Sequence, residues 1–262
     1  MTDYAQGLES ASDARVSPAD RNGFVTYDEF NGPDLDADRW EPARLPLPTG
    51  EHVPLDPNAE VAVGEGEVRV TIPRFSLSDD SLQSADSPKY LIFSTRRFEL
   101  PPDRPATFAV GLAVENIGGE PGDYRQGMAA FHVFDLEVSK RVFAVCGTSS
   151  RILALHEQLG LGGSGAGEPF YHAVESPYED FDDDFTWLRA CEVTLDRSTS
   201  TASWRVDGHT VYEAHGTVIP ERARTGFGIW TMQPIRGGRT RSLSGQGLSA
   251  RWRRFRVSAV DA

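Results

Sequence analysis

The stretch Thr107-Phe-Ala-Val-Gly-Leu-Ala-Val-Glu115 carries a large apolar side chain at every second position. These side chains are Phe108, Val110, Leu112 and Val114. Successive side chains of a strand point to opposite sides of a sheet, so the alternation predicts a strand with one buried face. Phe185 to Leu195 repeats the pattern, with Arg189 interrupting the apolar face. Each stretch therefore predicts a strand with one buried face.

Similar apolar runs, separated by Gly, Pro, Asp and Asn, extend along the rest of the chain. They predict strands over 67–73, 90–100, 128–138, 141–147, 151–157, 201–206, 225–232 and 250–258. Asp207-Gly208, between two of the apolar runs, is a typical hairpin turn. The 25 Gly and 17 Pro spread through the chain argue against long helices. The one helix that the sequence predicts is short, around Leu153 to Leu159. Many short strands without amphipathic helices predict an all-β fold in which two antiparallel sheets form a sandwich.

The length and composition fit one large β-sandwich domain. Of the 262 residues, 39% are hydrophobic, which is enough for a substantial core without disulfides or a metal. Residues 1–22 are polar and acidic, so we expect a flexible tail, followed by a single domain over 23–262. Cys146 and Cys191 lie in apolar runs that resemble strands, and we expect both to be buried thiols.

The charge of the chain argues against two classes of partner. A net charge of −13 disfavours nucleic acids and anionic membrane surfaces, because both bind positively charged proteins. No run is long and apolar enough to span a bilayer, and the first ten residues lack the features of a signal peptide. On these grounds we expect a cytoplasmic protein.

Four pieces of the chain, spread over residues 24–258, resemble the concanavalin A-like lectin/glucanase superfamily. In order they are Tyr27 to Trp40, Phe93 to Phe98 with Ala106 to Val114, Trp204 to Gly208, and Arg251 to Val257. The resemblance implies a jelly-roll sandwich with a concave binding face. It extends to uncharacterised actinobacterial members of the superfamily, which imply no particular activity.

Hydrolases of this superfamily carry a Glu-x-Asp-x-x-Glu or Glu-x-Asp-x-Glu strand, whose alternating carboxylates point into the cleft. The corresponding stretch here is Met128-Ala-Ala-Phe-His-Val-Phe-Asp-Leu-Glu137. Asp135 and Glu137 remain as an alternating pair, but Val133 or Phe131 stands at the leading position. Retaining hydrolysis needs two carboxyl groups about 5 Å apart, so the incomplete motif implies that this hydrolysis is lost.

His132, Asp135 and Glu137 are nevertheless the first catalytic candidates. Asp135 and Glu137 share one face of the predicted strand, while His132 points to the other face. The alternative, which we favour, is a polar strand end before a turn at Ser139-Lys140.

A second group of catalytic candidates flanks the glycine-rich stretch 160–167. It comprises His156, Tyr171 and His172, and Tyr178 follows as a substrate-binding candidate. Imidazoles and a phenol beside a mobile loop are typical of an acid/base site under a lid, and the alternative is ordinary loop residues. The glycines themselves lack the βαβ context of a dinucleotide site.

The remaining substrate-binding candidates are Trp230, Arg96, Arg97 and Glu115. Trp230 alternates with glycines on its face, which predicts room for a ligand against the indole ring. Arg96 and Arg97 should point to opposite faces, so we expect one of them on the concave side.

We expect no cofactor and no metal. Asp34, Asp36 and Asp38, or the acidic stretch 179–184, would suit a structural Ca²⁺, but solvated acidic loops are the favoured interpretation. An EF-hand is excluded because Arg39 stands where that loop needs glycine. No His-x-x-x-His or Cys-x-x-Cys pair indicates zinc.

Three functions remain compatible with these observations. The preferred hypothesis is a cofactor-independent enzyme, a cyclase, isomerase or lyase of specialised metabolism, that binds a small organic molecule on the concave face. The first alternative is a carbohydrate-active protein, either a divergent glycoside hydrolase or a glycan-binding module. The second alternative is a protein-interaction domain without enzymatic activity.

Overall fold

The computed structural model describes residues 23–47, 50–76, 86–160, 168–176, 184–232, 235–236, 239–240 and 245–258. The predicted tail 1–22, most of the glycine-rich stretch, Tyr178 and nearly all of 179–184 lie outside these residues. None of the described residues lies in a helix long and apolar enough to cross a membrane.

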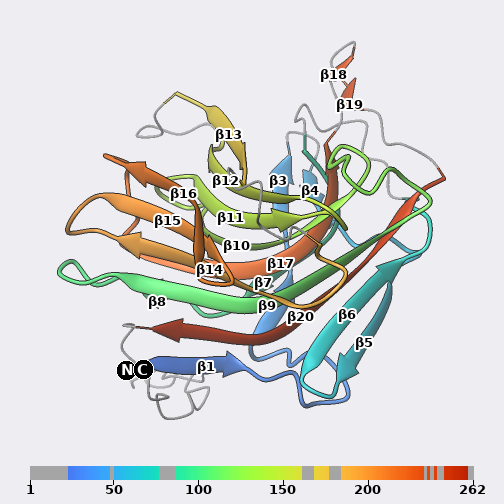
Figure 1. The fold of residues 1–262 in the computed structure, drawn as a ribbon, viewed down its shortest axis with the longest axis horizontal. Coiled ribbons are helices and arrows are strands. Elements are labelled where there is room, and N and C mark those ends of the chain that lie inside the picture. Colours follow the sequence, from blue (N-terminus) through green and yellow to red (C-terminus); the bar gives the residue numbers. More distant parts are fainter. Residues whose placement is uncertain are drawn as a thin grey trace, which may run out of the picture.

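Two antiparallel sheets of eight strands each make up the fold (Figure 1). The first sheet has the order β16 (His209–His215), β15 (Thr201–Val206), β14 (Arg189–Asp196), β9 (Ala106–Ile117), β20 (Gly247–Ser258), β6 (Glu67–Ile72) and β5 (Glu60–Gly64), and β1 (Phe24–Asp28) pairs with β20. The second sheet has the order β13 (Phe170–Glu175), β12 (Ile152–Gln158), β11 (Arg141–Gly147), β10 (Met128–Asp135), β17 (Arg222–Met232), β7 (Asp86–Ser94) and β2 (Trp40–Pro42), and β8 (Phe98–Glu99) pairs with β17. Two short ribbons, β3 (Leu45–Leu47) with β4 (Gly50–His52) and β18 (Ile235–Arg236) with β19 (Arg239–Thr240), complete the described strands.

The core lies between the two sheets, where the period-two alternation predicted it. Phe108 of β9 stands opposite Val193 of β14, and both side chains are buried. Across the interface, the Phe227 ring of the second sheet packs 4.8 Å from the Trp252 ring of the first. The Trp252 indole nitrogen donates a hydrogen bond to the Ala130 carbonyl, so even this polar atom is satisfied in the core.

The predicted hairpin at Asp207-Gly208 is confirmed. It joins β15 to β16, and the two turn residues have φ values of 47° and 80°. Positive φ at both central positions is the type I′ turn that matches the twist of paired strands.

Two sequence predictions about secondary structure are wrong. The segment predicted as a short helix is β12, whose seven residues are all buried. A strand buried on both faces is a continuous apolar run, which periodicity alone does not separate from a buried helix. The run 90–100 is also not one strand, because a bend at residues 95–97 separates β7 from β8.

Candidate functional site

The face of the second sheet that is turned away from the first sheet, here called the outer face, contains the strand that corresponds to the hydrolase motif. That strand, β10, lies between β11 and β17. Phe131 and Val133 point into the core between the sheets. The alternate positions therefore point to the outer face, and they are Met128, Ala130, His132 and Phe134.

An aromatic cage surrounds His132 on this face. The centroid of its imidazole lies 5.8 Å from the Phe93 ring, 5.4 Å from the Phe134 ring and 5.8 Å from the Trp230 ring. Gly226 is the neighbour of His132 on β17, and a Cβ atom at that position would lie 2.8 Å from Nε2. The glycine therefore makes the space that the imidazole fills.

The His132 imidazole is buried and unpaired. Its residue is 4% exposed, and neither ring nitrogen has a hydrogen-bond partner in the described part of the chain. Burial lowers the pKa of His132 from 6.5 to about 3, so the ring is neutral near pH 7. A buried polar group without a partner costs about 1–3 kcal/mol, and a neutral imidazole can both donate and accept. His132 therefore offers a ligand two unused hydrogen-bonding atoms.

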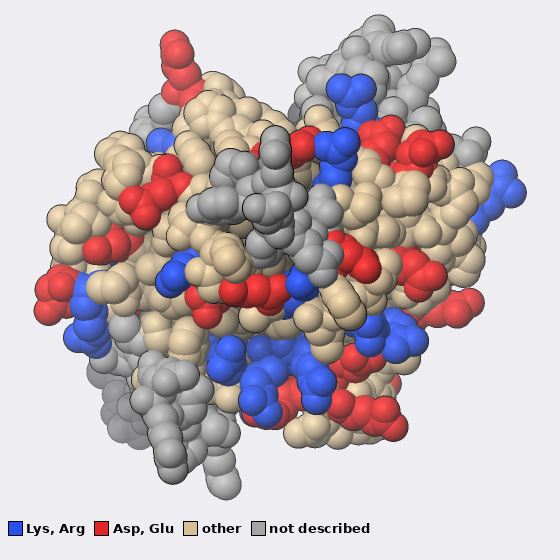
Figure 2. Space-filling view, viewed as in Figure 1, with Lys and Arg blue, Asp and Glu red and all other residues tan. Residues whose placement is uncertain are grey.

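Apolar clusters lie on both sides of His132. One contains Met128, Ala130, Ala144, Cys146, Leu153, Leu155 and Trp230, and Tyr124, Tyr171 and Met232 pack against it. The other contains Ala43, Phe93 and Phe134, and Leu45, Leu136 and Val142 pack against it. The first sheet differs from this: basic side chains gather over β20 (Figure 2), where Arg251 pairs with Glu67.

The glycines beside Trp230 do not leave open room for a ligand, contrary to the sequence prediction. A Cβ atom at Gly228 would lie 2.7 Å from Leu91 Cδ1, and one at Gly226 would meet both His132 and Phe93. Neighbouring side chains fill the space that each glycine leaves, and Trp230 is only 7% exposed.

Asp135 and Glu137 do not form a carboxylate pair in the cleft. The Asp135 carboxylate accepts hydrogen bonds from the backbone N–H groups of Glu137, Val138 and Ser139 and closes the turn after β10. Burial raises the pKa of Asp135, but these hydrogen bonds outweigh it, and the pKa is lowered overall. Glu137 forms an ion pair with Arg97, and both side chains are more than half exposed.

His156 lies in the core, on the opposite side of the second sheet from His132. Its ring stacks on Phe143 at 5.2 Å, and its Nε2 atom lies 3.0 Å from the Thr217 hydroxyl. Burial lowers the pKa of His156 to about 4, and the nearby Arg141 guanidinium adds to this effect.

Tyr171 and His172 are neighbours on β13 and point to opposite faces. His172 stands opposite His156, whereas the Tyr171 hydroxyl donates to the sulfur of Met232 and its ring packs against the outer-face cluster. The second group of catalytic candidates is therefore divided between the two faces.

The other substrate-binding candidates lie elsewhere. Arg96 stands in the bend after β7, with its guanidinium 5.3 Å from the Phe98 ring. Glu115 is exposed on β9 of the first sheet, away from the outer face. Among the predicted site residues that the structure describes, only His132 and Trp230 form a ring contact on the outer face.

Sequence reasoning missed Phe93 and Phe134, the other two walls of the cage. Phe134 could have been predicted from the sequence, because it lies two residues from His132 and therefore shares its face of the strand. Phe93 was not, because it reaches His132 through the pairing of β7 with β17.

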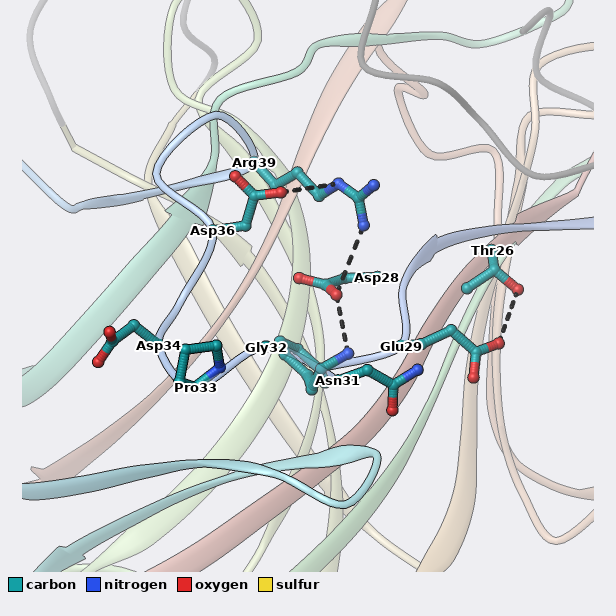
Figure 3. A pocket seen from close by; sticks show the side chains of 10 residues that line it. Thr26, Asp28, Glu29, Asn31, Gly32, Pro33, Asp34, Asp36 and Arg39 are labelled. Atoms are coloured by element: carbon teal, nitrogen blue, oxygen red, sulfur yellow. Dashed lines mark hydrogen bonds and ion pairs between the residues drawn. The ribbon is translucent and has the colours of Figure 1, made fainter.

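The acidic loop that suggested calcium surrounds a pocket of about 420 Å³ (Figure 3). Asp28 in this pocket accepts hydrogen bonds from the Trp40 indole and the Phe30 backbone and lies 3.5 Å from Arg39. Asp36 pairs with the same Arg39 at 3.3 Å. Within the described ranges no three His, Cys, Asp or Glu side chains are grouped to hold a metal ion. The carboxylates of Asp28 and Asp36 therefore serve the structure of this loop.

A family model described as "Family of unknown function (DUF6081)" matches residues 27–261. No curated protein matches the sequence.

Solved structures similar to the chain include several glucanases with low sequence identity. The endo-1,3-beta-glucanase from Streptomyces sioyaensis is 13% identical with a TM-score of 0.56, over 92% of this chain and 99% of that one. The endo-beta-1,3-glucanase from Pyrococcus furiosus is 12% identical with a TM-score of 0.57, over 90% and 93%. LamA from Z. galactanivorans, in complex with laminaritriose and laminaritetraose, is 10% identical with a TM-score of 0.53, over 88% and 96%. These similarities confirm the concanavalin A-like jelly-roll sandwich that the sequence predicted.

Proposed function

The chain belongs to the family of unknown function DUF6081, and from its glucanase-type fold we propose that it is a carbohydrate-active protein that binds a glycan without hydrolysing it. The proposed site is the cage of His132, Phe93, Phe134 and Trp230 on the outer face. The observation that carries the proposal is the buried imidazole, unpaired within the described residues, on the strand that corresponds to the hydrolase motif.

The side chains of β10 argue for binding rather than hydrolysis. Glycoside hydrolysis by the common mechanisms needs two carboxyl groups that flank the scissile bond. The outward positions of β10 carry no carboxylate, and Asp135 and Glu137 are engaged in a turn and in an ion pair.

The side chains of the cage have the chemistry that contacts with a sugar ring require. Aromatic rings pack against the apolar faces of sugars, and the neutral imidazole can exchange hydrogen bonds with a hydroxyl group. Because His132 and Trp230 are nearly fully buried, a ligand has to displace part of the apolar covering to reach them.

The acid/base enzyme favoured by the sequence has less support in this geometry. A general base works best when its pKa lies near the working pH. The pKa values of His132 and His156, about 3 and about 4, lie well below neutrality, and the two rings point to opposite faces.

The test is calorimetric titration with laminaritriose, combined with an assay for released reducing sugar. We expect binding without hydrolysis, at least tenfold weaker binding in His132→Leu, and partial recovery in His132→Gln, which keeps a donor and an acceptor. Glu137→Gln is the matched control on the same strand end and should bind like the unchanged protein. Hydrolysis that disappears in Glu137→Gln, or equal binding by His132→Leu, would contradict the proposal.

A further inference from the structure

A second pocket opens at the flank of the sandwich, where the edges of the two sheets face each other. β5 is the last strand of the first sheet (Figure 1), and β2 is the last strand of the second. Residues from both edges and from the segment before β5 line an open pocket of about 540 Å³. Pockets that bind small molecules have volumes of about 300–1,000 Å³.

Most of the residues that line the pocket are apolar. Trp40, Tyr90 and Ile92 line it and are buried, with exposed fractions of 4%, 6% and 3%. Leu55 and Val61 also line it but are 37% and 44% exposed. An exposed apolar rim above a buried apolar floor is typical of a ligand site rather than of a solvated surface.

Tyr90 supplies a polar group inside this apolar pocket. Its side chain is more than nine-tenths buried, and its hydroxyl makes no hydrogen bond to any residue in the described ranges. Burial raises the pKa of Tyr90 to about 12, so the hydroxyl stays protonated at neutral pH and can donate.

Two carboxylates also line the pocket, and both have partners of their own. The Asp56 oxygens accept hydrogen bonds from the Asn58 backbone and from the backbone and hydroxyl of Ser76. Glu41 forms an ion pair with Arg224. The pocket therefore combines aromatic and aliphatic walls with a neutral hydroxyl donor.

We propose that this pocket binds a small neutral aromatic molecule bearing one hydroxyl or carbonyl group, with its ring against Trp40 and Ile92 and its oxygen on the Tyr90 hydroxyl. The pocket is independent of the glycan cage. Tyr90 points into the interior between the sheets, whereas His132 lies on the outer face. Either site can therefore fail its test while the other stands.

The test uses 2-naphthol and naphthalene as a matched pair of probes with the full chain. Binding is followed by NMR through the indole N–H of Trp40 and the methyl groups of Ile92. We expect 2-naphthol to shift these signals, and Tyr90→Phe to weaken its binding about fivefold, the effect of one net hydrogen bond. Naphthalene should bind the unchanged protein and Tyr90→Phe equally.

Tyr212→Phe is the control, because it removes the same hydroxyl from the side chain that packs beside Trp204, remote from this pocket. It should leave binding of 2-naphthol unchanged. Val61→Trp at the exposed rim should block both probes, independently of any effect of the Tyr90 substitution on folding. The proposal is overturned if 2-naphthol at saturation shifts neither Trp40 nor Ile92, or if Tyr90→Phe binds 2-naphthol like the unchanged protein.

Discussion

Replacing His132 by leucine should make the protein less sensitive to acid. The pKa of the His132 imidazole is about 3 in the folded protein and 6.5 in an unfolded chain. The folded state therefore takes up a proton less readily than the unfolded state. Stability from this difference is fully present above pH 6.5 and is lost as the pH falls below 6.5 toward 3.

The size of the effect follows from the distance between the measurement pH and 6.5. At pH 5.5, one unit below the unfolded value, the unfolded state gains about 1.4 kcal/mol from protonation at this position. The folded state gains almost nothing there, because pH 5.5 is far above its pKa. Leucine does not titrate. Between pH 7.5 and 5.5 the free energy of unfolding should therefore fall by about 1.4 kcal/mol less in His132→Leu than in the unchanged protein. His156 remains in both proteins, and its contribution cancels in the comparison.

The assay is urea unfolding at pH 7.5 and pH 5.5, with the free energy of unfolding taken by linear extrapolation. The lower value stays above the isoelectric point of about 4.9, where solubility is poor. Phe134→Leu is the control, because it changes the same cage without removing a titrating group, and it should keep the original pH dependence. If His132→Leu loses as much stability as the unchanged protein, the imidazole is not held neutral in an apolar site, and the account of the cage fails.

Three further predictions concern the fold. Gly226→Ala should lower the free energy of unfolding in urea by about 1–3 kcal/mol, because its Cβ atom would lie 2.4 Å from the Ile92 carbonyl oxygen. An unchanged free energy of unfolding would show that β7 and β17 are not so closely paired. Gly208→Ala should cost about 1 kcal/mol, since its φ of 80° strains any other residue, and a neutral result would contradict the type I′ turn. Asp28→Ala should lower the free energy of unfolding by about 1–3 kcal/mol and change tryptophan fluorescence, because it removes the acceptor that lies 2.6 Å from the Trp40 indole nitrogen. Unchanged fluorescence would argue against that hydrogen bond.

The sequence predicts well those features that depend on neighbours along the chain. The alternation in 107–115 places Phe108 in the core because side-chain direction repeats every two residues. Asp207-Gly208 identifies its hairpin because φ above zero is a local requirement. The same local logic predicts that His132 and Asp135 point to opposite faces, and the structure has them so.

The cage itself could not be predicted, because it depends on pairing between strands that are distant in sequence. Phe93 and Trp230 meet His132 only because β7, β17 and β10 are adjacent in that order. Glycines at 226 and 228 show in the sequence that side chains are missing, but not whether a ligand or a neighbouring residue fills the space. Here neighbouring residues fill it, which is why the prediction of room against Trp230 is wrong.

The outward positions of β10 carry no carboxylates, and the face they belong to is buried. One physical constraint, the cost of removing a charge from water, links these two observations. Two ionised carboxylates in a face that excludes water would each carry a large desolvation cost, and their mutual repulsion would add to it. An imidazole avoids this cost, because it can remain neutral near pH 7 and still offer a donor and an acceptor. A face built in this way favours neutral, hydroxyl-bearing ligands over charged ones. The low pKa of His132 also sets the pH dependence of binding. The folded imidazole stays neutral until the pH approaches 3, so glycan binding should be equal at pH 7.5 and pH 5.5. Glycan binding that weakens tenfold between these two pH values would contradict a neutral imidazole in the cage.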